Sequence, residues 1–208
     1  VQNTAVGDTT LVGVTTGYEN VAVGHQAGYA VSTGYSNVAV GKDALFDLTT
    51  GYKNTIVGTK AGFELTDGVG NTLMGNESGK NLASSHNNTA VGNGALTAAT
   101  SGSNNTCVGS QAGDVLTTGA TNVCVGYNVD AGDNGVNNTF GIGSGITSTD
   151  NRFSFGKGSN VVFNDFTSDN SWTRSSDERK KTNIANATLG LDFVNDLRTI
   201  TYKWKRSQ

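Results

Sequence analysis

The sequence predicts an all-β fold, a parallel β-solenoid or β-roll of 17-residue coils that ends in a short α+β segment. Two observations indicate this fold. Asparagine recurs at an exact spacing of 17 residues, and a glycine follows each of these asparagines four residues later. The asparagines are Asn3, Asn20, Asn37, Asn54, Asn71, Asn88, Asn105 and Asn122, and the glycines are Gly7, Gly24, Gly41, Gly58, Gly75, Gly92, Gly109 and Gly126. A fixed period of this length indicates stacked copies of one structural unit.

The composition agrees with a repetitive β architecture. The 208 residues include 29 Gly and no Pro, 35% are hydrophobic, and the net charge of −3 is too small for a disordered chain of that hydrophobicity. Residues 1–150 carry four Lys/Arg and eleven Asp/Glu, whereas residues 151–208 carry ten and six. Neither part has the dense basic patch of a nucleic-acid-binding protein. No run approaches the roughly 18 apolar residues of a membrane helix, so we expect no membrane insertion.

Each 17-residue unit is long enough for two short strands and two tight turns. The first strand is the segment that reads TAVG or VAVG, and a second, weaker strand is expected in the segment A-G/L-x-x-L-T-T-G. The glycine that ends the first strand predicts a corner with positive φ, which a residue without Cβ adopts without a clash. We expect the recurring asparagines to stack in a ladder that bonds to the backbone of adjacent coils. Counting an imperfect copy at Asn138, about nine coils are predicted.

The first strand is apolar on both faces. Its middle residue is apolar in every coil: Ala5, Ala22, Ala39, Ile56, Leu73, Ala90, Cys107 and Cys124. A strand that is apolar on both faces is buried on both. One face can pack inside a thin coil, and we expect the face of the middle residues to be covered by other copies of the chain. A threefold bundle fits small side chains on an elongated unit better than a twofold sandwich, although the sequence does not fix the number.

The repeat unit, NTAVGxxAGxxLTTGxx, resembles repeats that are common in phage and bacterial surface fibres. It is also similar to the heads of trimeric autotransporter adhesins, whose shorter NSVAIG repeats build a parallel β-roll within a trimer. The resemblance covers residues 1–143 and implies a homotrimeric fibre. Because the period differs from that of the adhesin heads, their turn geometry need not apply to this chain.

Residues 144–175 are expected to form a tapering, aromatic-rich connector. The period shortens here, since NTFGIG at 138–143 and NRFSFG at 151–156 are 13 residues apart. Aromatic residues also become frequent, which suggests a broader end at which chains interlock. Beyond this connector, residues 176–208 predict a short α+β segment. Leu189, Phe193, Val194 and Leu197 share one helix face, and TITYKWK alternates as a strand.

Residues 176–208 resemble the start of the C-terminal intramolecular chaperone of endosialidases and other phage tail fibres. The family motif S-D-x-R-x-K-x-N-I is followed by a helix and a strand that ends near W-K. The matching residues are Ser176, Asp177, Arg179, Lys181, Asn183 and Ile184, then Trp204 and Lys205. The family domain extends well beyond this point, so the resemblance covers only its first part.

The resemblance implies a single self-cleavage. In that family the chaperone trimerises the fibre and then cuts itself off before the motif serine. Carried over, Ser176 is the nucleophile, Lys181 is its general base, and the cut bond joins Ser175 to Ser176. Asp177 and Arg179 support the pair. The chemistry is coherent because a serine hydroxyl becomes nucleophilic once a neighbouring base takes its proton.

Other candidate sites receive structural interpretations. Cys107 and Cys124 hold the same repeat position, within reach of a disulfide, but they replace Ala, Ile and Leu and act as small hydrophobic residues. We therefore expect them to be unpaired.

The loop with Asp130, Asp133 and Asn134 has too few oxygen ligands for calcium and is interpreted as a turn. His25 and His86 are expected to be isolated surface residues without a second ligand nearby. We expect no cofactor and no metal.

The sequence therefore predicts the shaft of a trimeric, receptor-binding tail fibre or tailspike on a phage or phage-like particle, located on the virion tail or particle surface. Its expected partners are other copies of itself, a glycan or outer-membrane receptor on the host cell, and tail or baseplate proteins reached through a preceding N-terminal region. No turnover activity is expected.

Three alternatives remain open. A bacterial trimeric adhesin head shares the repeats, but its stalk and barrel would replace the chaperone motif. A glycan-depolymerising tailspike would need an acidic pair in a groove, and no such pair shows. An ice-binding solenoid would need a flat Thr-x-Thr array, whereas the threonines here are adjacent.

Overall fold

The computed structural model describes residues 2–168 and 173–174. The chain divides into two units, residues 1–175 and 176–208, and every described residue belongs to the first. The described residues form strands, turns and loops and contain no helix. The strands are β1 (Thr4–Val6), β2 (Val21–Val23), β3 (Val38–Val40), β4 (Thr55–Val57), β5 (Thr72–Met74), β6 (Thr89–Val91), β7 (Thr106–Val108), β8 (Val123–Val125), β9 (Asp130–Ala131), β10 (Phe140–Ser144), β11 (Thr147–Ser148), β12 (Arg152–Lys157), β13 (Asn160–Asp165) and β14 (Thr173–Arg174).

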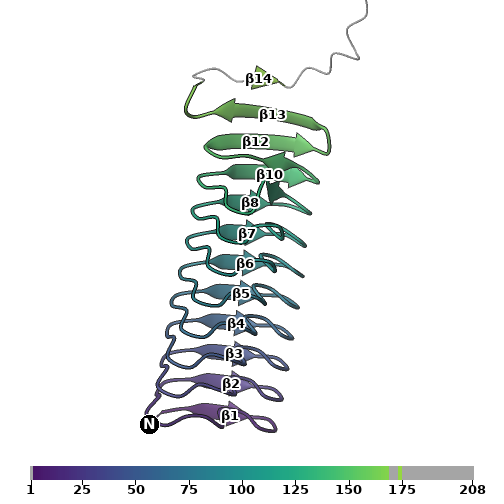
Figure 1. Cartoon of the computed structure of the whole chain (residues 1–208). Coiled ribbons are helices and arrows are strands. Elements are labelled where there is room, and N and C mark those ends of the chain that lie inside the picture. The colour runs from purple at the N-terminus through teal and green to yellow at the C-terminus, as the bar shows by residue number, and fades with distance from the viewer. Residues whose placement is uncertain (1, 169–172, 175–208) are drawn as a thin grey trace, which may run out of the picture. The chain divides into compact units, whose positions relative to one another are not determined.

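The coils stack so that each contributes one strand to a continuous sheet, which is parallel from β1 to β12 (Figure 1). β1 to β8 pair in sequence order, and each residue pairs with the residue 17 positions later, as Ala5 does with Ala22. The sheet continues through β10 and β12 and ends in the antiparallel strands β13 and β14. A second, two-stranded parallel sheet joins β9 to β11. The predicted parallel β-solenoid with a 17-residue period is confirmed.

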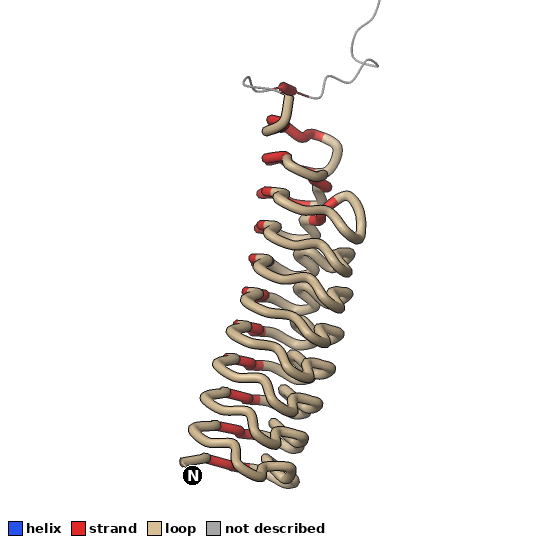
Figure 2. The backbone as a smooth tube through the Cα atoms, turned by 60° about the vertical axis from the view of Figure 1, so that its left-hand side comes forward, coloured by secondary structure: helices blue, strands red, loops and turns tan. Residues whose placement is uncertain are grey.

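The return half of a coil is the part between its strand and the next ladder asparagine. In the coils that begin with β1 to β7 it contains no second strand, so that prediction is wrong for them, and only β9 and β11 in the last coils form one (Figure 2). The backbone enters the left-handed region twice within three residues, for example at Asp43 (φ 55°) and Leu45 (φ 55°), which is incompatible with an extended strand. The backbone groups are nevertheless paired between coils. The N–H of Gly28 donates to the carbonyl of Ala44 at 2.9 Å, and that of Ala30 donates to the carbonyl of Phe46 at 3.0 Å. Backbone bonding is thus maintained without a regular ladder.

From β2 to β8, the middle residue of each strand packs inside its own coil, whereas Ala5 of the terminal strand β1 is exposed. Ala22, Ile56, Leu73 and Cys107 are completely buried in the single chain. The expectation that this face is covered by other copies is therefore wrong. Leucines of the return half, such as Leu65, fill the space opposite these strand residues. The thin coil has one interior, and the middle strand residue alone faces it.

The size of the middle residue is matched six positions later within the same coil. A Cβ added at Gly79 would lie 2.8 Å from Cδ1 of Leu73, so a large strand residue leaves no room for a side chain there. Where the strand residue is alanine, leucine can take the later position and is buried. The pairs are Ile56 with Gly62, Leu73 with Gly79, Cys107 with Gly113, Ala39 with Leu45, and Ala90 with Leu96. This exchange keeps the core of these coils filled. In the coil of Ala22 the later position is Gly28, and the side chain of Leu11 from the preceding coil lies against it instead.

The recurring asparagines form the predicted ladder. The Nδ2 of Asn54 donates to Oδ1 of Asn37 at 3.0 Å and to the carbonyl of Gly68 at 2.8 Å. Its Oδ1 accepts from the backbone N–H of Asn71 at 2.9 Å. The glycine that follows each strand has positive φ, 142° at Gly58, so the predicted corner conformation is confirmed.

The 17-residue register persists one coil further than expected. β10 pairs with β8 at a spacing of 17, and the N–H of Thr139 donates to Oδ1 of Asn122 at 3.0 Å. Thr139 therefore takes the ladder position, and Asn138 lies one residue before it. The period then shortens to 13, since Phe140 pairs with Phe153. Their rings stack with centroids 4.7 Å apart.

Candidate functional site

The exposed face of the main sheet is the candidate association surface. It consists of the first and third residues of β1 to β8, and we call it the outer strand face. Its members are Thr4, Val6, Val21, Val23, Val38, Val40, Thr55, Val57, Thr72, Met74, Thr89, Val91, Thr106, Val108, Val123 and Val125. None of them is buried in the single chain, and Val6 (56%), Val21 (38%) and Met74 (42%) are the most exposed of its apolar members.

The outer strand face is uncharged along eight successive coils. Only Thr, Val and Met occur in it, and Ile142 (39% exposed) and Phe155 (43%) extend it over β10 and β12. Because the strands are in exact register, equivalent side chains form two straight rows along the sheet. The row of third residues is apolar throughout, and the row of first residues consists of Thr and Val. An exposed apolar row beside an uncharged one is typical of a protein–protein contact.

Two aromatic ladders were not predicted from the sequence. Tyr18, Tyr35 and Tyr52 stack with ring centroids 5.0 and 4.6 Å apart, and Tyr29, Phe46 and Phe63 stack with centroids 4.9 and 5.0 Å apart. The signal was present, since each set recurs at a spacing of 17 residues. Their contact depends on the stacking of coils, which a count of motifs does not include.

His25 has acidic neighbours on both sides, which corrects the expectation that it is isolated. Its Nε2 lies 3.7 Å from Oδ2 of Asp8, and its Nδ1 lies 3.7 Å from Oδ1 of the buried Asp43. His86 is exposed, and its Nδ1 accepts from the backbone N–H of Val69 at 3.1 Å. Within the described part of the chain, no group of three or more His, Cys, Asp or Glu side chains is arranged to hold a metal ion.

Asp130 differs from the simple turn residue expected. It lies in β9, is 8% exposed, and has a buried Oδ1 without a hydrogen-bond partner. Burial and the nearby carboxylate of Asp114 raise its pKa to about 6. Asp133 does lie in a turn, where its Oδ1 accepts from the N–H of Asn134 at 2.6 Å.

Cys107 and Cys124 are both buried and unpaired, which confirms the expected structural role. They are direct partners in the register of β7 and β8. A hydrogen bond with Cys124, and then burial, raise the pKa of Cys107, so its thiol stays protonated at neutral pH.

The residues expected to carry self-cleavage lie outside the described residues. They are Ser176, Lys181, Asp177 and Arg179, together with the Ser175–Ser176 bond. The helix and strand predicted within residues 176–208 also lie outside. Among the described residues, no helix is both long and apolar enough to cross a membrane.

Comparison with known families identifies the C-terminal part of the chain. A family model described as the chaperone of endosialidase matches residues 176–208. This match confirms the resemblance drawn from the S-D-x-R-x-K-x-N-I motif. We call residues 176–208 the chaperone segment. Searches of curated proteins and of solved structures found no match to this chain. The chain thus combines a parallel β-solenoid with a C-terminal segment that matches the chaperone of endosialidase.

Proposed function

We propose that this chain is the shaft of a trimeric tail fibre or tailspike that attaches a phage or phage-like particle to its host cell. The observation that carries the proposal is the joining of two parts in one chain. A β-solenoid with an uncharged outer strand face is followed by a chaperone segment of the endosialidase type. Such segments are typical of phage tail proteins, and their role is to assemble identical chains into a fibre.

The outer strand face supplies the contact between chains. Chains that carry their chaperone segments at the same end associate in parallel, so the rotation axis follows the stack of coils. In that arrangement each coil meets the equivalent coil of its neighbours, and Val or Thr side chains meet their own kind. The absence of charge from Thr4 to Val125 on this face means that no ion is desolvated when the chains associate.

The number of chains is tested by mass. Sedimentation equilibrium and native mass spectrometry of the purified chain should give three copies in a complex that does not dissociate on moderate dilution. A stable monomer would contradict the proposal, because its outer strand face would then be exposed to water. A stable dimer would keep the self-association but remove the threefold arrangement.

The place of action is tested on particles. Gold-labelled antibody against residues 1–150 should mark the tails of particles released from a lysed culture. Label on intact bacterial cells, with bare particles, would instead favour the alternative of a trimeric adhesin head. A tail fibre and a bacterial adhesin head would carry the same solenoid in different places, so only the location of the label distinguishes these two functions.

A further inference from the structure

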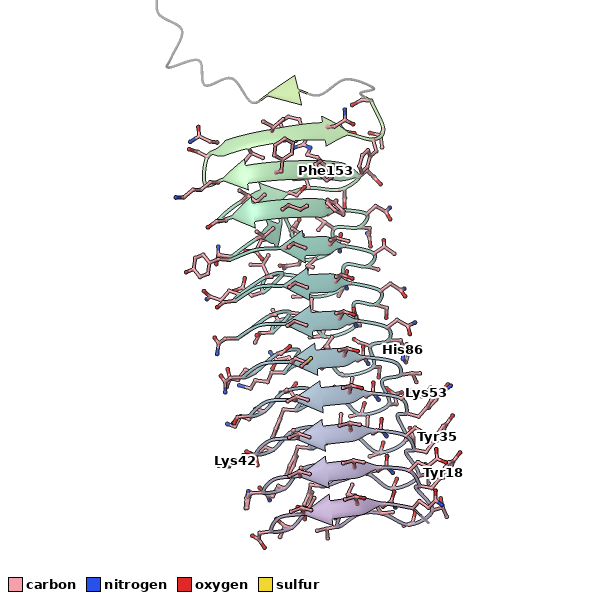
Figure 3. The ribbon with its side chains drawn as sticks, turned by 180° about the vertical axis from the view of Figure 1, so that it is seen from behind. Tyr18, Tyr35, Lys42, Lys53, His86 and Phe153 are labelled. Atoms are coloured by element: carbon pink, nitrogen blue, oxygen red, sulfur yellow. The ribbon has the colours of Figure 1, made fainter. Side chains whose placement is uncertain are left out.

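One edge of the solenoid carries a row of phenol groups, which we call the tyrosine ladder. It consists of Tyr18, Tyr35 and Tyr52, whose rings are parallel to within 5° and 6° and stack at 5.0 and 4.6 Å. Tyr18 is 44% exposed, and the other two are partly exposed. Tyr18 and Tyr35 project from the edge opposite the one that carries Lys42 (Figure 3).

The fold does not require aromatic residues at this position. In later coils the same position holds Val69, His86, Ser103, Ala120 and Asn137. The backbone hydrogen bond to the next coil is the same with either kind of residue. The carbonyl of Tyr18 accepts from the N–H of Ser36 at 3.0 Å. The carbonyls of Val69 and Ser103 accept from the equivalent N–H groups, of Asn87 and Thr121, at 2.9 and 3.1 Å. The six residues of the two aromatic ladders are nearly all the Tyr and Phe residues before Phe140, with Tyr127 as the exception. Aromatic residues are therefore concentrated in the first coils without a demand from the backbone.

The ladder presents oxygen-binding chemistry to the solvent. Each ring covers the face of the next, so the row offers ring edges and hydroxyl groups. Ring edges carry partial positive charge, and phenol hydroxyls both donate and accept. Burial, with the neighbouring rings of Tyr52 and Tyr18, raises the pKa of Tyr35, so its hydroxyl remains a donor at neutral pH. A ligand with regularly spaced oxygen atoms fits such a row.

The charges beside the ladder are balanced and already engaged. Glu19 accepts from the hydroxyl of Ser36 at 2.9 Å, and the Nζ of Lys53 lies 5.9 Å from the ring centroid of Tyr52. One acid and one base at the two ends give no net attraction for an ion. The ladder also lies on an edge of the coils and not on the outer strand face, so association of the chains through that face leaves it accessible.

We propose that the tyrosine ladder binds a neutral glycan chain that lies along the stack of coils. The proposal rests on the proposed function, because it assigns the host-attachment role to one edge of the shaft. Sugar hydroxyls and ring oxygens would bond to the phenol groups at successive coils, so affinity would accumulate along the chain. Tyrosine suits this task because it gives large contact area at low loss of side-chain freedom.

The test uses an array of purified bacterial capsular and O-polysaccharides, with calorimetric titration of each polysaccharide that binds. Wild type should bind at least one neutral polysaccharide, with little change between 0.15 and 0.5 M NaCl. The double variant Tyr18→Ala, Tyr35→Ala should lose about tenfold or more in affinity. Tyr35→Phe keeps the stacked ring and removes only the hydroxyl, so its affinity should fall by a smaller factor than that of the double variant. Tyr127→Ala is the control, since Tyr127 is exposed (59%) but outside the ladder, and it should bind as wild type does.

The outcomes separate this proposal from the proposed function. Each variant is also weighed by native mass spectrometry. If the protein is a trimer but binds no neutral polysaccharide, the ladder proposal is overturned and the proposed fibre function is unaffected. The same holds if the ladder variants bind polysaccharide as wild type does. A monomer whose glycan binding depends on Tyr35 supports the ladder and overturns the trimer. If Tyr35→Phe lowers only the melting temperature, the ladder is structural and the proposal fails.

Discussion

Leu73 and Met74 are consecutive residues of β5, yet Leu73 is completely buried and Met74 is 42% exposed. Adjacent side chains of a strand point to opposite faces. Leu73 therefore belongs to the core of its coil, whereas Met74 belongs to the outer strand face. Both residues are apolar, so composition does not tell them apart.

This relationship predicts different results for a charge at each position. Met74→Glu should leave the coil folded but weaken the proposed trimer, because an unpaired carboxylate would be buried between its chains. Leu73→Glu should unfold the solenoid, because the charge would enter a core without a partner. The measurements are sedimentation equilibrium and thermal unfolding by circular dichroism. An intact trimer in Met74→Glu would place the contact between chains elsewhere.

The sequence predicted the stacking direction and register because the 17-residue spacing relates each residue to its partner in the next coil. It did not predict which side of the strand faces inward, since both sides carry apolar residues, as Ala22 and Val23 illustrate. The wrong second strand has a similar cause. Alanine and leucine occur in the return half as they do in strands, but its backbone turns twice at positive φ. The signal for this turn was the glycine that replaces Leu45 in other coils, Gly28, Gly62, Gly79 and Gly113, which all have positive φ.

Asn54 should be among the most sensitive polar residues of the shaft. It is completely buried and bonds through both its amide nitrogen and its oxygen to neighbouring coils. Asn54→Ala leaves several buried groups unpaired, so we expect a loss of about 3–5 kcal/mol in the free energy of unfolding. Asn93→Ala is the matched control. Asn93 is exposed, and removal of its side-chain amide should change the free energy of unfolding by less than about 0.5 kcal/mol. Denaturant unfolding measures both, and similar midpoints would reject a structural role for the ladder.

Gly58 holds the corner after β4 with φ of 142°, and a Cβ at this position would collide with the carbonyl oxygen of Gly75. Gly58→Val should therefore destabilise the protein by more than about 1 kcal/mol. The neighbouring Thr59 is exposed, so Thr59→Val should change the melting temperature much less. Equal shifts for the two variants would show that the corner is not conformationally demanding.

Asp130 should give the end of the regular coils a stability that depends on pH. Its pKa is raised from 3.8 to about 6, so the folded protein binds this proton more tightly than the unfolded chain does. The stabilisation is complete below about pH 4 and is lost as pH rises through about 6, with an expected change of about 1–3 kcal/mol. Asp130→Asn should remove this part of the pH dependence and raise the melting temperature at pH 7.5.

The control for Asp130 is Asp133→Asn, because Asp133 lies three residues away and is exposed. Its melting temperature should follow that of wild type from pH 4 to pH 8. The difference between wild type and Asp130→Asn is the quantity to plot, since other carboxyl groups also titrate in this range. A difference that does not vary with pH would mean that Asp130 is ionised throughout.

The candidate sites divide by the kind of signal that revealed them. The proposed self-cleavage residues, Ser176 and Lys181, were predicted from a local motif, all of whose positions lie within nine consecutive residues. The outer strand face and the tyrosine ladder depend on residues 17 positions apart, such as Tyr18 and Tyr35, whose contact exists only once coils have stacked. The carboxyl pair of Asp114 and Asp130 does not follow the 17-residue spacing, and only the folded structure brings it together.

The chaperone segment predicts one self-cleavage of the protein, between Ser175 and Ser176. Ser176→Ala should abolish it by removing the nucleophile. Lys181→Ala should abolish or greatly slow it by removing the base, because an unassisted serine hydroxyl is a weak nucleophile. Lys180→Ala is the matched control and should matter less. The measurement is the intact mass of the protein after expression.

Trimer formation should survive both blocking substitutions, because assistance in folding and scission of the chain are separate acts. The fraction cut should also be independent of dilution once trimers have formed, since the reaction is internal to the assembly. A slower reaction on dilution of formed trimers would indicate cutting between assemblies. A gene product that folds and trimerises but stays full length, with Ser176 and Lys181 intact, would show that this protein keeps its chaperone as a permanent end cap.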